Sequence, residues 1–291
     1  MPARYVARPA SADAYALGEG PVWDPVRDRL LWVDILANTV HEGRLGPAVV
    51  PIGSWEFPDT VGAVAPAADG ALLVAERHVL TRVDPDGTRT FVARVLPEGR
   101  ASRLNDGAVD PAGRFLVGSL AQDDRRGEEV LVRLDGGEVT VLDADLDLSN
   151  GLAWSPSGTE FYSVDTLPGV VHARGYDPAT GRVGERRDLL TIADGHPDGL
   201  CVDAAGNLWI AIWGGGRVEC RGPDGSLRAV VEVAAPNTSS VTFAGPDLDV
   251  LVITTAARGV PSPLRAANPA SGRLFTARVD ATGQPPVYWT P

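Results

Sequence analysis

Short apolar runs of four or five residues recur along the chain, each next to a turn that contains Asp, Pro or Gly. The repeats of this pattern begin at Asp28, Gly70, Gly113, Gly158, Gly206 and Leu248, at intervals of 42 to 48 residues. A second series of turn residues falls between them, at Gly46, Gly87, Gly136, Gly181, Gly225 and Gly272. Two interleaved series of turns with one common period indicate about four short strands per repeat.

A repeat of this length with four strands is typical of one blade of a β-propeller. Six units account for the 291 residues and leave no remainder for a second domain. We therefore predict an all-β fold, a six-bladed β-propeller formed by residues 1–291 as a single domain, in which the strand around Arg4 to Arg8 completes the last blade. A β-sandwich with regular turns is the alternative, but it does not require a fixed period. No longer segment shows a helical period.

One polar residue precedes the innermost strand of every unit when the units are aligned on the residue six positions downstream, usually a proline. These residues are Glu19, Thr60, Asn105, Asn150, Asp198 and Ser240. Innermost strands surround the central channel of a propeller, so the six are expected to form a ring on its axis. A cation with oxygen ligands would offset the crowding of two carboxylates and two amides. A water-filled channel lined by polar turn residues explains the ring equally well, and nearby His196 stays unassigned.

Composition narrows the function classes. The chain has 26 basic and 38 acidic side chains, a net charge of −12, and none of the basic residues is lysine. This excludes lysine Schiff-base chemistry and makes nucleic acid or an anionic membrane a poor partner. No apolar stretch approaches the length of a membrane span, and the first ten residues lack the apolar run expected of a signal peptide. With only Cys201 and Cys220 present, we expect a cytoplasmic protein with no disulfide scaffold. No obligate protein partner is evident from the sequence.

Several motifs in order along the chain resemble the senescence-marker-protein/gluconolactonase/regucalcin-like family. They occupy residues 17–24, 103–107, 110–114, 149–154, 197–203, 206–218 and 236–243. The resemblance implies a six-bladed propeller with one divalent metal on the axis, held by Glu19, Asn150 and Asp198. It also implies that Arg103 and Asn105 bind the substrate, a sugar lactone. The native metal stays open among Ca, Zn, Mn, Mg and Fe.

One position departs from the family. Several members carry an acidic residue in the substrate pocket where this chain has Gln122. We assign Gln122 to substrate binding, and because an amide both donates and accepts hydrogen bonds, the preferred pattern of sugar hydroxyls is expected to differ. Asp123 would take this role if the loop register shifts by one residue.

The resemblance implies metal-dependent hydrolysis of an aldonolactone, such as a glucono- or pentonolactone, to the aldonic acid. In this hypothesis the metal polarises the carbonyl and activates water, Asp198 is the general base and Arg103 stabilises the oxyanion or holds ring hydroxyls. Attack by a metal hydroxide without Asp198 as base is an alternative. Two other functions stay open: a metal-dependent esterase or phosphotriesterase on the same propeller, and a non-catalytic calcium-binding propeller.

Overall fold

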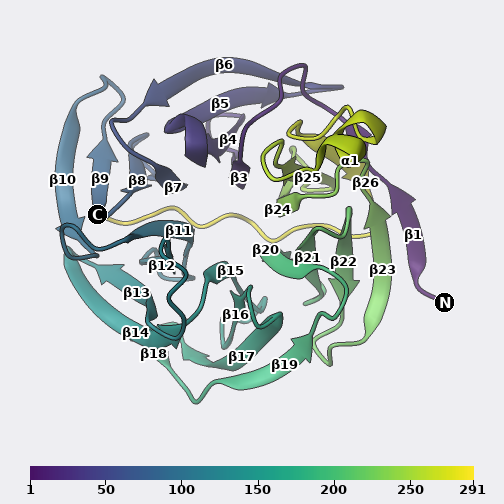
Figure 1. Cartoon of the computed structure of the whole chain (residues 1–291). Coiled ribbons are helices and arrows are strands. Elements are labelled where there is room, and N and C mark those ends of the chain that lie inside the picture. Colours follow the sequence, from purple (N-terminus) through teal and green to yellow (C-terminus); the bar gives the residue numbers. More distant parts are fainter.

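Six β-sheets stand in a ring around a central axis in the computed structural model (Figure 1). The structure describes the backbone of residues 1–291 and every side chain except those of Ser262 and Arg265. The first blade comprises β3 (Gly18–Asp24), β4 (Arg29–Asp34), β5 (Thr39–Leu45) and β6 (Val49–Glu56), with the 3-10 helix η1 (Ile35–Ala37) between β4 and β5. The second comprises β7 (Val61–Pro66), β8 (Leu72–Glu76), β9 (Val79–Val83) and β10 (Arg89–Arg94). The third comprises β11 (Ser102–Val109), β12 (Phe115–Ala121), β13 (Glu129–Asp135) and β14 (Glu138–Leu146).

The remaining blades are less regular at their outer edges. The fourth comprises β15 (Ser149–Trp154), β16 (Glu160–Asp165), β17 (Val170–Asp177), β18 (Arg182–Val183) and β19 (Arg187–Thr191), and both β18 and β19 pair with β17. The fifth comprises β20 (His196–Val202), β21 (Leu208–Trp213), β22 (Arg217–Arg221) and β23 (Leu227–Glu232), with β1 (Ala3–Val6) added in parallel to β23. The sixth comprises β24 (Thr238–Ala244), β25 (Val250–Thr255), β26 (Phe275–Arg278) and β2 (Arg8–Pro9). A short helix, α1 (Ser262–Ala267), lies between β25 and β26.

The all-β, six-bladed fold predicted from the repeat is confirmed, with two differences in blades five and six. The segment around Arg4 to Arg8 does not form one strand of the last blade: β1 joins blade five and only β2 completes blade six. The chain switches sheets at Ala7, which is buried and donates its backbone N–H to the carbonyl of Glu232. The second difference concerns the second series of turn residues. Most of them lie between the third and fourth strands of a blade, but Gly272 lies before the third strand, β26, because the connection from β25 contains α1.

The hydrophobic core lies between neighbouring blades and not on the axis. Leu73 and Leu80 of blade two pack with Phe115 and Val117 of blade three, and all four side chains are fully buried. Similar clusters join the other pairs of blades. Because apolar side chains on the two faces of each sheet fill the space between blades, the inner ends of the innermost strands are left to polar side chains.

The C-terminal segment crosses the end of the channel that faces away from the viewer in Figure 1 (yellow). Gln284 Nε2 donates to the carbonyls of Trp154 and Val202, in blades four and five, at 3.1 and 3.2 Å. Trp289 N then bonds the carbonyl of Pro66 in blade two at 2.9 Å. This segment therefore ties together blades that are distant in the sequence. In the described part of the chain, no helix has the length and apolar character needed to cross a membrane.

Candidate functional site

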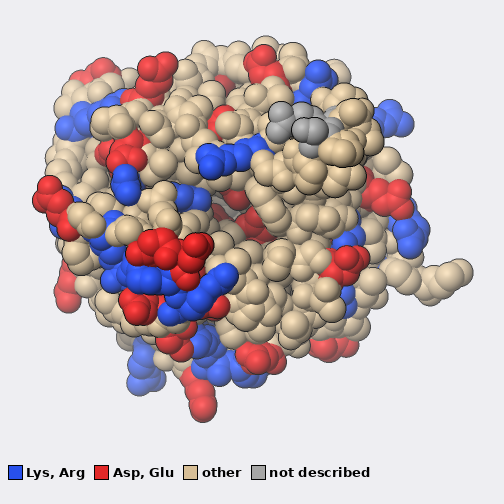
Figure 2. All heavy atoms as spheres, viewed as in Figure 1, with Lys and Arg blue, Asp and Glu red and all other residues tan. Residues whose placement is uncertain are grey.

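Two cavities lie on the axis, one at each end of the channel. The first, which we call the mouth cavity, has a volume of about 300 Å³, and Glu19, Asn105, Asn150 and Asp198 line its base. The second, about 500 Å³, lies on the side of the C-terminal segment and is lined by Gly20, Asp106 and Gln284, among others. Glu19 and Asn105 thus face the mouth cavity, whereas the residues that follow them, Gly20 and Asp106, face the second cavity. The innermost strands therefore form a floor between the two cavities. Figure 2 shows a hollow near the centre of one face with acidic side chains inside it.

A shift of register in each innermost strand turns the polar side chains toward the axis. In β3 the pairing with β4 is irregular between Glu19 and Val22, and in β15 the pairing with β16 is irregular between Asn150 and Leu152. The innermost strands of the other four blades have equivalent irregularities. A β-bulge bends the strand and re-aims a side chain. The motif read from the sequence therefore corresponds to a repeated backbone feature.

Glycine after the ring residue lets neighbouring innermost strands approach closely. A Cβ atom on Gly151 would lie 2.5 Å from the carbonyl oxygen of Asp198, a distance that no side chain tolerates. Gly199 is similarly confined by Ser240. The Asn-Gly and Asp-Gly pairs thus bring the side chains of Asn150 and Asp198 from separate blades into contact.

Asn150 and Asp198 form the centre of the cavity base, and both are 4% exposed. Asn150 Nδ2 donates to Asp198 Oδ1 and, at 3.1 Å, to Thr166 Oγ1. Asn150 Oδ1 is buried and has no hydrogen-bond partner among the described residues. A buried amide oxygen without a partner is costly, so this atom is available to a ligand.

Burial shifts the pKa values of the charged groups at the base. Burial, and secondarily the charge of Asp106, raises the pKa of Glu19 to about 8. Burial, followed by the charges of Glu19 and Asp106, raises the pKa of Asp198 well above its usual value. Burial lowers the pKa of Arg103 to about 10, against the opposing effect of Glu19 and Asp198. If Glu19, Asp198 and Asp106 were all ionised, the one guanidinium of Arg103 would leave two negative charges without a counter-charge, and the raised pKa values reflect this cost.

These residues fit a divalent cation. Its charge would balance the two excess carboxylates, and Asn150 Oδ1 would gain the partner that it lacks. No group of three His, Cys, Asp or Glu side chains in the described part of the chain forms a metal site by itself. The ligand set would thus consist of Glu19 and Asp198 together with the Asn150 amide, a set of oxygen donors typical of hard cations.

Replacing Asn150 with alanine is expected to weaken the affinity for divalent cations by at least about tenfold, because a ligand oxygen is lost. Isothermal titration calorimetry on the cation-stripped protein measures this change. Asn237→Ala is the matched control, since Asn237 is 6% exposed, bonds the carbonyl of Arg258 and lines neither cavity. Equal cation affinity in the two variants would show that Asn150 is not a ligand.

Residues 17–257 of the chain match a known protein family, described as the SMP-30/gluconolactonase/LRE-like region. The chain belongs to this family. A pentonolactonase of Haloferax volcanii is 36% identical over 280 residues, which cover 92% of this chain and 93% of the relative. A 6-deoxy-6-sulfogluconolactonase of Pseudomonas putida is 35% identical over 272 residues, 92% of each protein. The crystal structure of regucalcin from Agrobacterium tumefaciens, described as a calcium-binding protein, superposes with a TM-score of 0.94 at 28% identity over the whole of both chains.

The family assignment made from the motifs is therefore confirmed, and the structure brings five of the six site residues taken from the resemblance into one cavity. Arg103 and Asn105 lie beside Glu19 at its base. Arg103 Nη1 donates to Asn105 Oδ1 at 2.7 Å and to the Leu104 carbonyl at 3.0 Å, while Asn105 Nδ2 bonds the Ser149 carbonyl at 3.0 Å. The Asn105 amide thereby holds one edge of the guanidinium.

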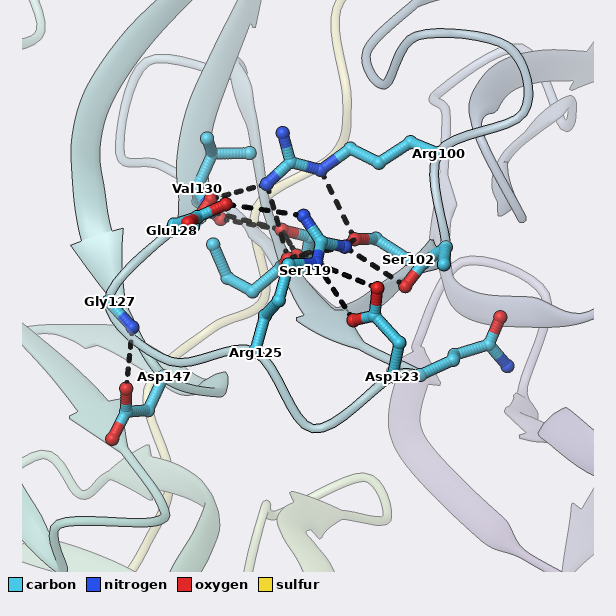
Figure 3. Close-up of polar contacts among 12 residues, drawn as sticks. Arg100, Ser102, Ser119, Asp123, Arg125, Gly127, Glu128, Val130 and Asp147 are labelled. Atoms are coloured by element: carbon cyan, nitrogen blue, oxygen red, sulfur yellow. Dashed lines mark hydrogen bonds and ion pairs between the residues drawn. The ribbon is translucent and has the colours of Figure 1, made fainter.

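Gln122, the sixth site residue, lies outside the mouth cavity. Its side chain is exposed, and its Oε1 accepts a hydrogen bond from Arg77 Nη2 at 2.9 Å. The loop that begins with Gln122 is fixed to the start of β11 through Arg125 (Figure 3). Arg125 bonds both carboxylate oxygens of Asp123, at 2.8 and 2.9 Å, and Ser102 Oγ at 3.0 Å. Because the Asp123 carboxylate is bonded to Arg125, it is not free to replace Gln122 in substrate binding. The role of Gln122 in substrate binding stays a prediction.

The ring expected from the sequence is incomplete as a cavity lining. Ser240 lines the opposite cavity, and Thr60 lines neither, because the register shift in each blade falls at a slightly different residue. Three residues that were not assigned lie at the site. Thr166 accepts a bond from Asn150, His196 lines the mouth cavity, and Asp106 lies below the floor. Asp106 directly follows the ring residue Asn105, and this position in the repeat is the only feature of the sequence that indicates its place at the site.

Proposed function

We propose that this protein is a sugar lactonase that hydrolyses an aldonolactone to the aldonic acid, with a divalent cation held by Glu19, Asn150 and Asp198. One observation carries the proposal: two buried carboxylates of raised pKa and a partnerless amide oxygen lie beside a buried arginine at the base of an open cavity. The relatives named as pentonolactonase and 6-deoxy-6-sulfogluconolactonase support the reaction class. The relative described as calcium-binding supports a cation.

In this proposal Asp198 is the general base. Water adds its oxygen to the lactone carbonyl carbon and transfers a proton toward Asp198. The bond between that carbon and the ring oxygen then breaks, and the ring oxygen takes up a proton to become a hydroxyl group. The Asp198 carboxylate is buried at the base of the mouth cavity, where one of its oxygens accepts a hydrogen bond from Asn150, so it lies where a water molecule at the base would transfer its proton. A bound divalent cation would polarise the carbonyl and lower the pKa of water.

Arg103 would stabilise the negative charge that develops on the carbonyl oxygen. Its Nη1 is engaged by Asn105 and the Leu104 carbonyl, which leaves the other donors of the guanidinium for the cavity that it lines. Because Arg103 is only 8% exposed, this interaction would be weakly screened by water. Asn105 acts on the guanidinium by holding its orientation.

Proton release from a panel of γ- and δ-aldonolactones tests the proposal. The protein is stripped with EDTA, and each divalent metal is then added back separately. We expect turnover of at least one lactone that depends on the cation and returns with it. Hydrolysis of carboxylic or phosphate esters in place of lactones would favour the esterase alternative. Cation binding with every hydrolysis rate at background would favour a binding propeller.

A further inference from the structure

The wall of the mouth cavity differs in character from its base. Five apolar side chains, which we call the apolar collar, surround the opening above the polar base: Leu17, Leu120, Leu148, Leu167 and Trp213. They come from the first, third, fourth and fifth blades and the segments that precede them, so they enclose the cavity on several sides. Leu167 is 37% exposed and the other four are partly exposed. Clustered exposed apolar groups at a cavity usually mark a binding surface.

The backbone directs these side chains together. Leu120 and Leu148 are paired in an isolated antiparallel bridge, so their side chains lie on the same side of the local backbone. Trp213 at the end of β21 pairs with His196 at the start of β20. Leu167 stands in the turn between β16 and β17, immediately after Thr166. The collar therefore stands on strand ends and one tight turn.

Polar side chains on the wall are confined to one sector. Of the described residues that line the mouth cavity above the base, only Thr166, His196 and, through its indole N–H, Trp213 carry polar side-chain atoms. All three belong to blades four and five. Thr166 Oγ1 already accepts a bond from Asn150. His196 Nδ1 faces the Thr166 carbonyl at 3.3 Å, which leaves the other ring nitrogen to bind one hydroxyl group.

A lactone with its carbonyl at the base would place its more distant carbons against the collar. A hydroxyl group pressed against leucine loses water without gaining a partner, which costs free energy. A methyl group at the same place gains from burial. We infer, on the basis of the proposed function, that the preferred substrates are deoxy-aldonolactones, whose carbon farthest from the carbonyl carries no hydroxyl group.

A matched pair of substrates tests this inference: 6-deoxy-glucono-1,5-lactone and glucono-1,5-lactone, which differ by one hydroxyl group. We expect kcat/KM of the cation-loaded protein to be about tenfold or more higher for the deoxy compound. Leu167→Asn is expected to remove most of this preference. Because Leu167 is an exposed turn residue, the variant is expected to fold. Leu227→Asn is the control, since Leu227 is also 37% exposed but lies on the outer strand β23.

Each outcome decides one question. Equal or higher efficiency with glucono-1,5-lactone would overturn the inference and leave the lactonase proposal intact. An unchanged preference in Leu167→Asn, or an equal loss in Leu227→Asn, would overturn the role of the collar. If every aldonolactone of the panel, this pair included, stays at background, the proposed function itself fails.

Discussion

Asp198→Asn is expected to lower kcat on an aldonolactone by about two to four orders of magnitude. Asparagine keeps the size of the side chain and one oxygen for a cation, but it cannot accept the proton of the attacking water. The affinity for the cation is expected to fall far less than the rate. Proton release in a pH-stat measures kcat, and calorimetry measures cation binding by the same variant.

Asp194→Asn is the control for this experiment. It removes the same charge four residues earlier, in the connection before β20, but the Asp194 side chain is 96% exposed and does not line the mouth cavity. Its turnover is expected to stay near that of the unmodified protein. Full activity in Asp198→Asn would refute Asp198 as the general base. Loss of cation binding as large as the loss of rate would reduce its role to that of a ligand.

In the cation-free protein, the melting temperature is expected to fall by several degrees as the pH rises from about 5 to about 8. The pKa of Glu19 is about 8 in the folded protein and has the ordinary value of 4.5 in an unfolded chain. Between these values the folded state binds more protons than the unfolded state, so the free energy of unfolding decreases with pH. Asp198 and Asp106 contribute in the same direction, because burial also raises their pKa values. Burial lowers the pKa values of His41 and His172, which oppose this trend, so the part due to Glu19 is measured by the variant Glu19→Gln.

Thermal melts in EDTA at several pH values measure this trend. Excess divalent cation is expected to raise the melting temperature most at the high end of the range, since it binds the folded state with both carboxylates ionised. Glu19→Gln should flatten the pH dependence in EDTA, whereas Glu98→Gln, an exposed control, should retain it. A slope that is the same in both variants would show that Glu19 is not its source.

The propeller and the centre of the site were predictable because both depend on position within a repeat. The apolar runs become the second strands of the blades, and Glu19, Asn150 and Asp198 share the point at which the innermost strand shifts register. The direction in which a loop side chain points does not depend on the repeat, so it could not be predicted in the same way. Gln122 faces Arg77, a contact between blades two and three that local sequence does not encode.

The apolar collar was not predictable for a related reason. Leucines such as Leu120 and Leu148 resemble core residues in the chain. Only the bridge between the end of β12 and the residue before β15, and the cavity that both line, show that they face an opening. The switch of β1 into blade five has a similar cause. A short strand of ordinary β-forming residues can extend either of two sheet edges, and the contacts of Ala7 with the chain near Glu232 determine which one.

The floor between the two cavities has a consequence for turnover. Its members Glu19, Asn150 and Asp198 are 4 to 7% exposed, so the mouth is the shared route for everything that the site exchanges. On the proposed function, the aldonate formed at the base must leave past the collar before another lactone can enter. Product and substrate would therefore compete for the same cavity opening. Accumulated aldonate would then inhibit the reaction by occupying the mouth cavity that the next lactone must enter.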